Sequence, residues 1–474
     1  MIGYFFNKGK LNFEQSVRAA LQRVDGAYAI VVLNKKEPDV MIAARKGSPL
    51  VLGVKDGEFF VGSDISPIIK HTQQIVYLED SQMAIIKDNE YKITSIDKDV
   101  SLPKKVEKID FKIDDYDKGK FKYFMHKEIH EQIDTISNTI TGRAKKDRVY
   151  LNGLLEYWTQ IKEADKIFIT ACGTSWHAGL IGKNLIERFA KIPVHVEYAS
   201  EFRYNKALVD NNSVVIAISQ SGETMDTIAA TELLKENGAH VLALVNVVGS
   251  SLARMADSVF YLHVGPEIGV ASTKAYLGML VGQLLLAKHW DSANKLDVSF
   301  DEIAELPKLI EETMACEKQI KDISEKIYKK KDIYFIGRGL DYALAAEGAL
   351  KLKEISYLHA EALAAGELKH GTLALIEDGT PIIVSASQNH LLDKTTSNVQ
   401  EVIARGAYVI AIGDNQSEKL ENISDEYVTL PDSNEILTTV ISIIPLQFIA
   451  YHVANLNGES IDQPRNLAKS VTVE

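Results

Sequence analysis

An internal repeat is the feature that most restricts how this 474-residue chain can fold. Four segments of the first half return in the same order in the second half: residues 166–173, 214–219, 238–245 and 257–262 correspond to 332–339, 382–387, 406–413 and 425–430. The last three pairs share one spacing, and the spacing of the first pair is shorter by two residues. Ordered matches at nearly constant spacing indicate a duplicated structural unit, because a chance match would not recur in register.

Each repeat alternates short apolar runs with longer helical patterns, from about residue 121 onward. This alternation is typical of βαβ units, whose parallel strands form a doubly wound sheet with helices on both faces. The fold class is therefore α/β. We expect one such domain at 148–295, a second at 320–455, and a C-terminal tail at 456–474.

The first hundred residues follow a different pattern. After a helical segment at 13–23, short apolar runs between residues 28 and 52 are separated by turn residues, which is typical of β-strands. We expect a β-rich domain at 1–105. The charged stretch that follows predicts an exposed linker, which leads to a helix within 106–147.

Composition limits the classes of partner. The chain has 53 Lys and Arg against 65 Asp and Glu, a net charge of −12, which argues against nucleic acid or a membrane surface as main partner. Cys172 and Cys316 are too few for a disulfide framework, so we expect a cytoplasmic protein. Residues 436–457 carry no charge over the length of a membrane span, but several are polar, and we expect a buried core helix.

A polar turn, SQSGET at 219–224, follows an apolar run of the first repeat and leads into a helical pattern. A helix start offers free N–H groups and the positive end of the helix dipole, which attract anions. An ordinary helix cap needs one hydroxyl or amide residue, so this cluster predicts a phosphate site. Further polar turns occur at 172–175 and 269–275. The equivalent turn of the second repeat, from residue 387, lacks the glycine and the threonine, so we expect only the first repeat to bind phosphate.

The second repeat and the tail carry titratable groups instead. Lys351 and Glu354 are three residues apart and share a helix face, where a surface salt bridge is the simplest interpretation. His370 precedes a glycine in a turn and is a candidate acid–base group, because imidazole titrates near neutral pH. Lys469 lies in a mostly apolar C-terminal segment, where a neutral amine could form a Schiff base with a carbonyl.

No metal and no cofactor are expected from the motifs. His126 and His130 are four residues apart, as in zinc proteases, but the order of residues around them differs and no third ligand is apparent. The GRG segment at 337–339 lacks the third glycine of a dinucleotide-binding motif.

These segments together resemble the glutamine–fructose-6-phosphate aminotransferase (isomerising) family, also called glucosamine-6-phosphate synthases. The motifs that carry the resemblance are CGTS (172–175), ASEFRY (199–204), SQSGET (219–224), EIGVASTKA (267–275), ALKLKEISYLHAEALAAGELKHG (349–371), PRNLAKSVTVE (464–474), DGAYAI (25–30) and RKGSPLVLG (45–53). The resemblance covers essentially the whole chain. It implies two tandem sugar-isomerase (SIS) domains, preceded by a truncated β-rich remnant of an N-terminal-nucleophile glutaminase domain.

The resemblance also implies roles for individual residues. Lys469 would form an imine with C2 of opened fructose 6-phosphate, Glu354 would move a proton between C1 and C2, and Lys351 would assist at the sugar oxygens. His370 would open the sugar ring from the neighbouring subunit of a homodimer. The residues implied in substrate binding are Thr174, Ser175, Ser219, Gln220, Ser221, Thr224, Val270, Ser272 and Ala468. The product would be glucosamine 6-phosphate, with glutamine or ammonia as the nitrogen source.

One departure from the family concerns the glutaminase. The family uses an N-terminal cysteine whose own α-amino group serves as the base, whereas this sequence begins Met1-Ile2. Neither Cys172 nor Cys316 is near that end. We therefore expect isomerase or ammonia-dependent activity, without hydrolysis of glutamine.

Two other functions fit part of the pattern. A related sugar-phosphate isomerase or deglycase would share the phosphate turn but would not need the C-terminal tail. A non-catalytic sugar-phosphate sensor would bind the same ligand without turnover. Such sensors commonly carry a helix-turn-helix domain, whereas the first hundred residues here are β-rich.

Overall fold

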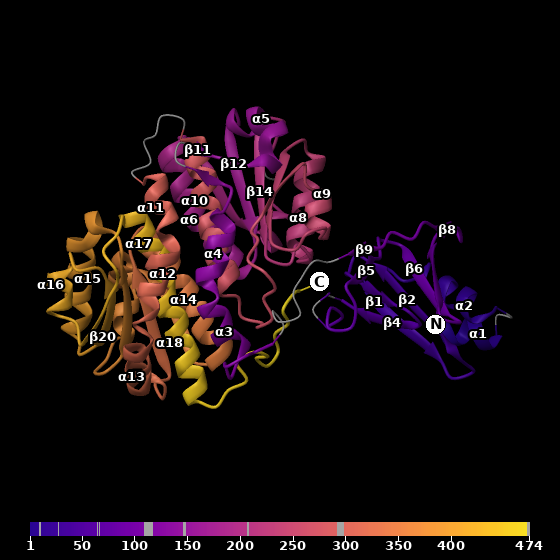
Figure 1. Cartoon of the computed structure of the whole chain (residues 1–474). Helices are drawn as coiled ribbons and strands as arrows, with labels where there is room; N and C mark the ends of the chain where they lie inside the picture. The colour runs from indigo at the N-terminus through magenta and orange to yellow at the C-terminus, as the bar shows by residue number, and fades with distance from the viewer. Residues whose placement is uncertain are drawn as a thin grey trace. The chain divides into compact units, whose positions relative to one another are not determined.

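The chain forms two compact units in a computed structural model (Figure 1). The structure describes residues 1–8, 11–26, 28–63, 65, 67–108, 117–145, 148–205, 208–291 and 298–471. The first unit comprises the described residues within 1–117, 223–225 and 470–474. The second comprises those within 118–222 and 226–469.

The first unit is built from two antiparallel sheets and two helices, which confirms the expected β-rich fold. The helices are α1 (Ile2–Lys8) and α2 (Phe13–Leu21). One sheet contains, in spatial order, β1 (Tyr28–Asn34), β2 (Glu37–Lys46), β6 (Gln82–Lys87), β7 (Glu90–Ser95) and β8 (Ser101–Leu102). The other contains β4 (Glu58–Gly62), β3 (Val51–Lys55), β5 (Gln74–Tyr77) and β9 (Glu107–Lys108).

Alternation along β2 and β6 explains this layering. Ile42 and Ala44 pack with Phe13 and Val17 of α2, whereas the intervening Ala43 packs toward the second sheet. Successive side chains of a strand point to opposite faces, so the first sheet is covered on both sides.

The second unit opens with short elements that lead into two parallel sheets. These are α3 (Phe124–His130), α4 (Gln132–Ile140), β10 (Ala144–Lys145), β11 (Arg148–Val149), the 3₁₀ helix η2 (Asn152–Tyr157) and α5 (Trp158–Lys162). The strands of the first parallel sheet are β12 (Lys166–Ala171), β13 (Val194–Tyr198), β14 (Ser213–Ser219), β15 (His240–Val245) and β16 (Ser258–Tyr261). Its helices are α6 (Gly173–Ala190), α7 (Ala199–Phe202), α8 (Met225–Glu236), α9 (Ser251–Met255) and α10 (Lys274–Trp290).

Three helices connect this sheet to the second one: α11 (Phe300–Ala304), α12 (Leu306–Met314) and α13 (Glu317–Ile327). The strands of the second sheet are β17 (Asp332–Gly337), β18 (His359–Ala364), β19 (Pro381–Ala386), β20 (Tyr408–Gly413) and β21 (Glu426–Thr429). The remaining helices are α14 (Leu340–Ser356), η3 (Ala365–His370), η4 (Thr372–Leu375), η5 (Asn389–Leu391), α15 (Leu392–Ile403), α16 (Glu418–Glu421), α17 (Glu435–Ile441) and α18 (Ile443–Leu456).

The two parallel sheets have the same topology, which confirms the duplication inferred from the sequence. Their spatial orders are β13-β12-β14-β15-β16 and β18-β17-β19-β20-β21, and all neighbouring strands are parallel. The repeated sequence segments are therefore equivalent strands at equivalent positions. Every residue of β14 and β15 is buried, as expected for central strands covered by helices on both faces.

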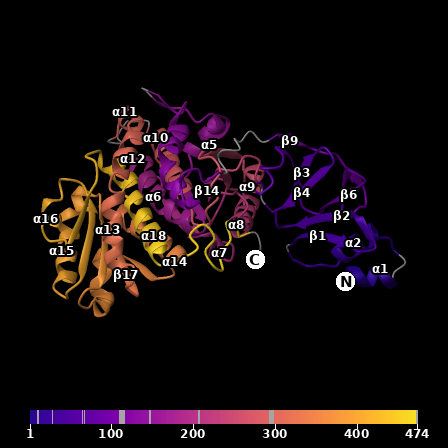
Figure 2. The same ribbon diagram turned by 60° about the horizontal axis from the view of Figure 1, so that its bottom comes forward.

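Helices α6, α10, α14 and α18 lie between the two sheets (Figure 2) and share one continuous apolar core. α14 of the second repeat packs against α6 of the first repeat and against α18. Residues of two repeats are thereby brought into contact across the middle of this unit.

The expected core helix is also present. Residues Glu435–Leu456 are long and apolar enough to cross a membrane, and they are the only such stretch in the described part of the chain. Every residue in the most apolar 18-residue window of this stretch is buried inside the protein. The prediction of a buried helix is confirmed.

Candidate active site

The predicted phosphate turns follow adjacent parallel strands. β12 ends at Ala171, and Gly173 then begins α6 with a φ of +52°. β14 pairs directly with β12 and ends at Ser219; Gln220 follows it, and Thr224 immediately precedes α8. Because β13 pairs on the opposite side of β12, the strand order reverses between β12 and β14. Open α/β sheets bind ligands outside the carboxyl ends of the strands at such a reversal.

Buried hydroxyl groups mark both turns. Ser175 in the first turn of α6, Ser219 and Ser221 are each buried. The Gly222 N–H donates to Ser219 Oγ over 3.0 Å and closes the turn. Gly222 has a φ of +65°, and a Cβ there would lie 2.1 Å from Ser250 Oγ, so only glycine fits. The sequence therefore places neutral donors on a turn of fixed shape.

Lys469 is anchored to the loop that precedes α10. Its Nζ donates to Glu267 Oε2 over 2.7 Å and to the Gly269 carbonyl over 2.8 Å. Ser272 Oγ donates to the same Glu267 oxygen over 2.8 Å, and two backbone N–H groups at the start of α10 donate to the other. Burial alone would raise the pKa of Glu267, but Lys469 and these hydrogen bonds outweigh burial and lower it to about 2. An ionised carboxylate thus faces the lysine amine.

A second buried carboxylate, Glu128 of α3, holds the other side of this loop. Its Oε1 accepts hydrogen bonds from the backbone N–H groups of Ile268 and Gly269. Its Oε2 is buried and has no hydrogen-bond partner among the residues that the structure describes. Burial and the neighbouring Glu267 raise the pKa of Glu128 to about 7. A Cβ on Gly269 would lie 2.9 Å from this free oxygen, which explains the glycine.

Lys351 and Glu354 belong to a network that joins the two repeats. Lys351 Nζ donates to Glu354 Oε2 over 2.6 Å and to Thr174 Oγ1 of α6 over 2.9 Å. It also pairs with Glu347 Oε1 over 3.4 Å. Glu347 in turn accepts hydrogen bonds from Thr174 Oγ1 over 3.0 Å and from His177 Nδ1 over 2.8 Å. The pair is therefore a buried network and not the surface salt bridge of the simplest interpretation.

Lys351 remains a cation in this network. Its side chain is 1% exposed, and burial lowers its pKa, but Glu347, Glu354 and Glu267 together raise the pKa above the usual range. A lysine that keeps its proton can donate to sugar oxygens but cannot act as a base.

In the second repeat, a carboxylate fills the equivalent of the phosphate turn. Asp341, in the first turn of α14, corresponds to Ser175 in α6. The Ser387 N–H and Oγ donate to Asp341 over 3.0 and 2.6 Å, and the Gln388 N–H donates over 3.2 Å. Burial raises the pKa of Asp341 to about 6, so it is largely ionised at neutral pH. The donors that an anion would need there are already taken by the chain itself.

The remaining predicted residues are placed as follows. Val270 lies in the loop that holds Lys469, and Ala468 is exposed next to Lys469 in the sequence. His370 is exposed at the end of η3. Within the described part of the chain, none of the other predicted catalytic groups hydrogen-bonds to His370. The structure of one chain therefore brings Lys351 and Glu354 together and leaves His370 apart.

Sequence reasoning missed several polar residues that the structure places at this site, among them the buried Glu128, Glu267 and Glu347 and the partly buried His177. Glu347 lies four residues before Lys351, so the helix-spacing rule that paired Lys351 with Glu354 could have found it. Glu267 stands within a largely apolar loop, where a lone carboxylate is a signal of function. His177 follows Thr174 by three residues and shares its helix face.

Comparisons with known proteins identify the fold of the second unit. The family described as "SIS domain" matches residues 160–288 and 326–456, so the fold is that of a protein with two tandem sugar-isomerase domains.

Full-length relatives narrow the class further. The chain is 45% identical to "Glutamine--fructose-6-phosphate aminotransferase [isomerizing]" of Chlorobaculum tepidum, over 99% of this chain and 77% of that protein. It is also 45% identical to the protein of the same name from Pyrococcus horikoshii, over 98% of this chain and 76% of that protein. The chain belongs to the glutamine–fructose-6-phosphate aminotransferase (isomerising) family, as the sequence motifs predict.

Solved structures support the same fold. The C-terminal domain of glucosamine-fructose-6-phosphate aminotransferase from Francisella tularensis is 39% identical, with a TM-score of 0.70, over 73% of this chain and all of that one. A glucosamine-6-phosphate deaminase from Thermotoga maritima, at 22% identity and a TM-score of 0.58, has the same fold over 73% of this chain and 99% of that one.

Proposed function

We propose that the second unit converts fructose 6-phosphate to glucosamine 6-phosphate, with ammonia as the nitrogen source. The main support for this proposal is the position of the Lys469 amine. Its Nζ lies 2.7 Å from Glu267 Oε2, beside the loop that contains Val270 and Ser272. These contacts fix the position of the amine, which must lose its proton before it can add to a sugar ketone and form an imine. The family relationship supports this substrate.

The proposed chemistry divides between the two repeats. Nζ of Lys469 adds to C2 of the open sugar and water leaves, which forms an imine. Ammonia then adds to the imine carbon and displaces the lysine amine, which leaves an imine of ammonia at C2. Glu354 takes a proton from C1, which is acidified by this imine, and returns it to C2, so that C1 becomes an aldehyde and C2 carries the amine. Lys351, charged and buried, donates to the sugar oxygens as negative charge develops there.

The same proposal assigns the remaining binding residues. The phosphate is bound by hydroxyl, amide and backbone groups of the two turns: Thr174, Ser175, Ser219, Gln220, Ser221 and Thr224. Val270, Ser272 and Ala468 contact the sugar. His370 opens the ring from the partner subunit of a homodimer, which is consistent with its exposure in the single chain. The enzyme works in the cytoplasm, without nucleic acid or membrane partners.

Trapping the imine tests the proposal. Incubation with fructose 6-phosphate and borohydride should reduce the imine to a stable secondary amine, and peptide mass spectrometry should find the sugar phosphate on Lys469. Lys353, on the exposed face of α14, is the internal control and should stay unmodified. Equal labelling of many surface lysines, or no label on Lys469, would exclude the imine.

Substitutions in the phosphate turn give an independent test of ligand binding, and the equivalent position in the second repeat serves as the control. Ser219→Ala removes the hydroxyl that closes the turn, so the Kd for fructose 6-phosphate should rise about 10-fold to 100-fold, as for loss of a hydrogen bond to a charged group. Ser387→Ala, at the equivalent position of the second repeat, should leave the Kd unchanged, because Asp341 already fills that turn. Calorimetric titration measures both, and a larger effect of Ser387→Ala would contradict the assignment.

A further inference from the structure

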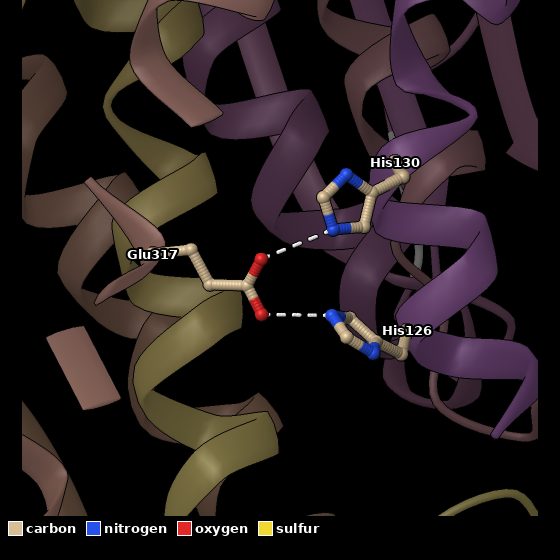
Figure 3. Close-up of side chains that lie close together, drawn as sticks. All are labelled: His126, His130 and Glu317. Atoms are coloured by element: carbon tan, nitrogen blue, oxygen red, sulfur yellow. Dashed lines mark hydrogen bonds and ion pairs between the residues drawn. The ribbon is translucent and has the colours of Figure 1, made fainter. Parts of the chain in front are cut away.

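The two histidines that the sequence left without a third ligand are joined by a carboxylate in the structure. His126 and His130 lie on one face of α3, and both ring Nε2 atoms point to Glu317 at the start of α13 (Figure 3). The distances to its two oxygens are 2.8 and 3.1 Å. The three ligand atoms all lie within 4.8 Å of one another, although almost two hundred residues separate the histidines from the glutamate.

A third imidazole reaches the same carboxylate. His452 of α18 has its Nε2 3.1 Å from Glu317 Oε1. The cluster therefore joins three helices: α3 and α13 supply the three ligand atoms that lie within 4.8 Å of one another, and His452 of α18 contacts the same carboxylate. This set of His126, His130, Glu317 and His452 is called the three-helix cluster below.

The spacing of these atoms is close to that of a metal site. Zinc binds imidazole nitrogen and carboxylate oxygen at about 2.0–2.2 Å in a tetrahedron, so neighbouring ligand atoms are about 3.3 Å apart. The nitrogen–oxygen distances of 2.8 and 3.1 Å from Glu317 to His126 and His130 are close to that value, and all three ligand atoms lie within 4.8 Å of one another.

Aromatic side chains hold two of the imidazoles in place. Tyr451 stacks on His126 with ring centres 4.4 Å apart, and Phe121 stacks on His130 at 5.1 Å. The side chains of His126, His130 and Glu317 are still 19%, 30% and 24% exposed, so an ion can reach them from solvent. The cluster is thus both oriented and accessible.

We propose that the three-helix cluster binds a divalent first-row transition metal, of which zinc fits best. Imidazole nitrogens favour zinc and its neighbours, whereas calcium and magnesium prefer sites built from oxygen. The bound ion fixes the seven-residue helix α3 to α13 and α18. Since α3 also carries Glu128, the ion positions the helix that holds the loop of Lys469.

Metal titration of the full chain tests the site without reference to enzymatic activity. Protein freed of metal with a chelator is titrated with ZnCl₂ in competition with a chromophoric chelator, and separately with Co²⁺, whose visible absorption reports tetrahedral nitrogen and oxygen ligands. We expect one ion per chain with a Kd of about 1 µM or below, and a higher melting temperature with zinc.

Variants distinguish this site from adventitious binding. His130→Gln and Glu317→Gln should each weaken zinc binding by at least about 100-fold and abolish the thermal shift. His390→Gln breaks another His–Glu pair, with Glu435 at 2.9 Å, and should bind zinc as the unaltered protein does. Circular dichroism without metal establishes that each variant is folded. A Kd above about 100 µM in the unaltered protein, or equal affinity in His130→Gln, would overturn the proposal.

Discussion

Replacing Lys469 with alanine is expected to lower kcat for conversion of fructose 6-phosphate by about 10³-fold or more, because no amine remains to form the imine. The phosphate turns lie on other elements, so the Kd for the sugar phosphate should change only a few-fold. Steady-state assays of glucosamine 6-phosphate formation with ammonia measure the first quantity, and calorimetry measures the second.

A second substitution separates chemistry from structure. Lys469→Ala also leaves Glu267 buried without its cation, which lowers stability by itself. Lys469→Arg keeps a positive charge beside Glu267, so it should retain the fold while losing the imine and the activity. An arginine variant that turns over at near the normal rate would show that no covalent intermediate forms at this position.

Replacing Lys351 with methionine is expected to reduce the free energy of unfolding by about 3–5 kcal/mol. The substitution leaves the fully buried Glu347 without the cation of Lys351. Among the residues that the structure describes, Thr174 and His177 then remain as its hydrogen-bond donors. Lys353→Met, on the exposed face of the same helix, should change stability by about 0.5 kcal/mol or less. Urea unfolding of both variants gives the comparison.

The cause of that loss can be identified by a second change. If the cost comes from the uncompensated Glu347 carboxylate, then Glu347→Gln in the Lys351→Met background should recover part of the stability, because the buried charge is removed. A double variant less stable than Lys351→Met alone would mean that the methionine side chain fails to pack, and that charge is not the cause.

Local pattern was enough to predict the repeat and the position of the polar turn at 219–224, between a strand and a helix. Strands such as β14 and β19 are continuous apolar runs because helices cover both faces, so they stand out in the sequence. The turn after Ser219 could also be recognised in the sequence, because several glycine and hydroxyl residues occur together where the chain passes from a strand to a helix. Both signals lie within a few consecutive residues.

Contacts between distant residues could not be predicted in the same way. Lys469 meets Glu267 across a separation of 202 residues, and Thr174 meets Glu347 across 173. The residues next to each partner in the sequence give no sign of the contact. The packing of α6 against α14 brings Thr174 and Glu347 together in a buried network. For the same reason, the sequence did not reveal that Glu317 lies beside His126 and His130, from which it is separated by 191 and 187 residues.

Asp341 gives the two copies of the duplicated fold different thermodynamic behaviour. In the second copy, the carboxylate of Asp341 occupies the turn as a built-in anion, so this turn is filled whatever the concentration of the metabolite. Under the proposed function, the first copy instead binds free sugar phosphate, which would stabilise it by mass action. One copy would then hold a permanent anion and the other would respond to the metabolite, so that added substrate should slow hydrogen exchange around β12 and β14 more than around β17 and β19.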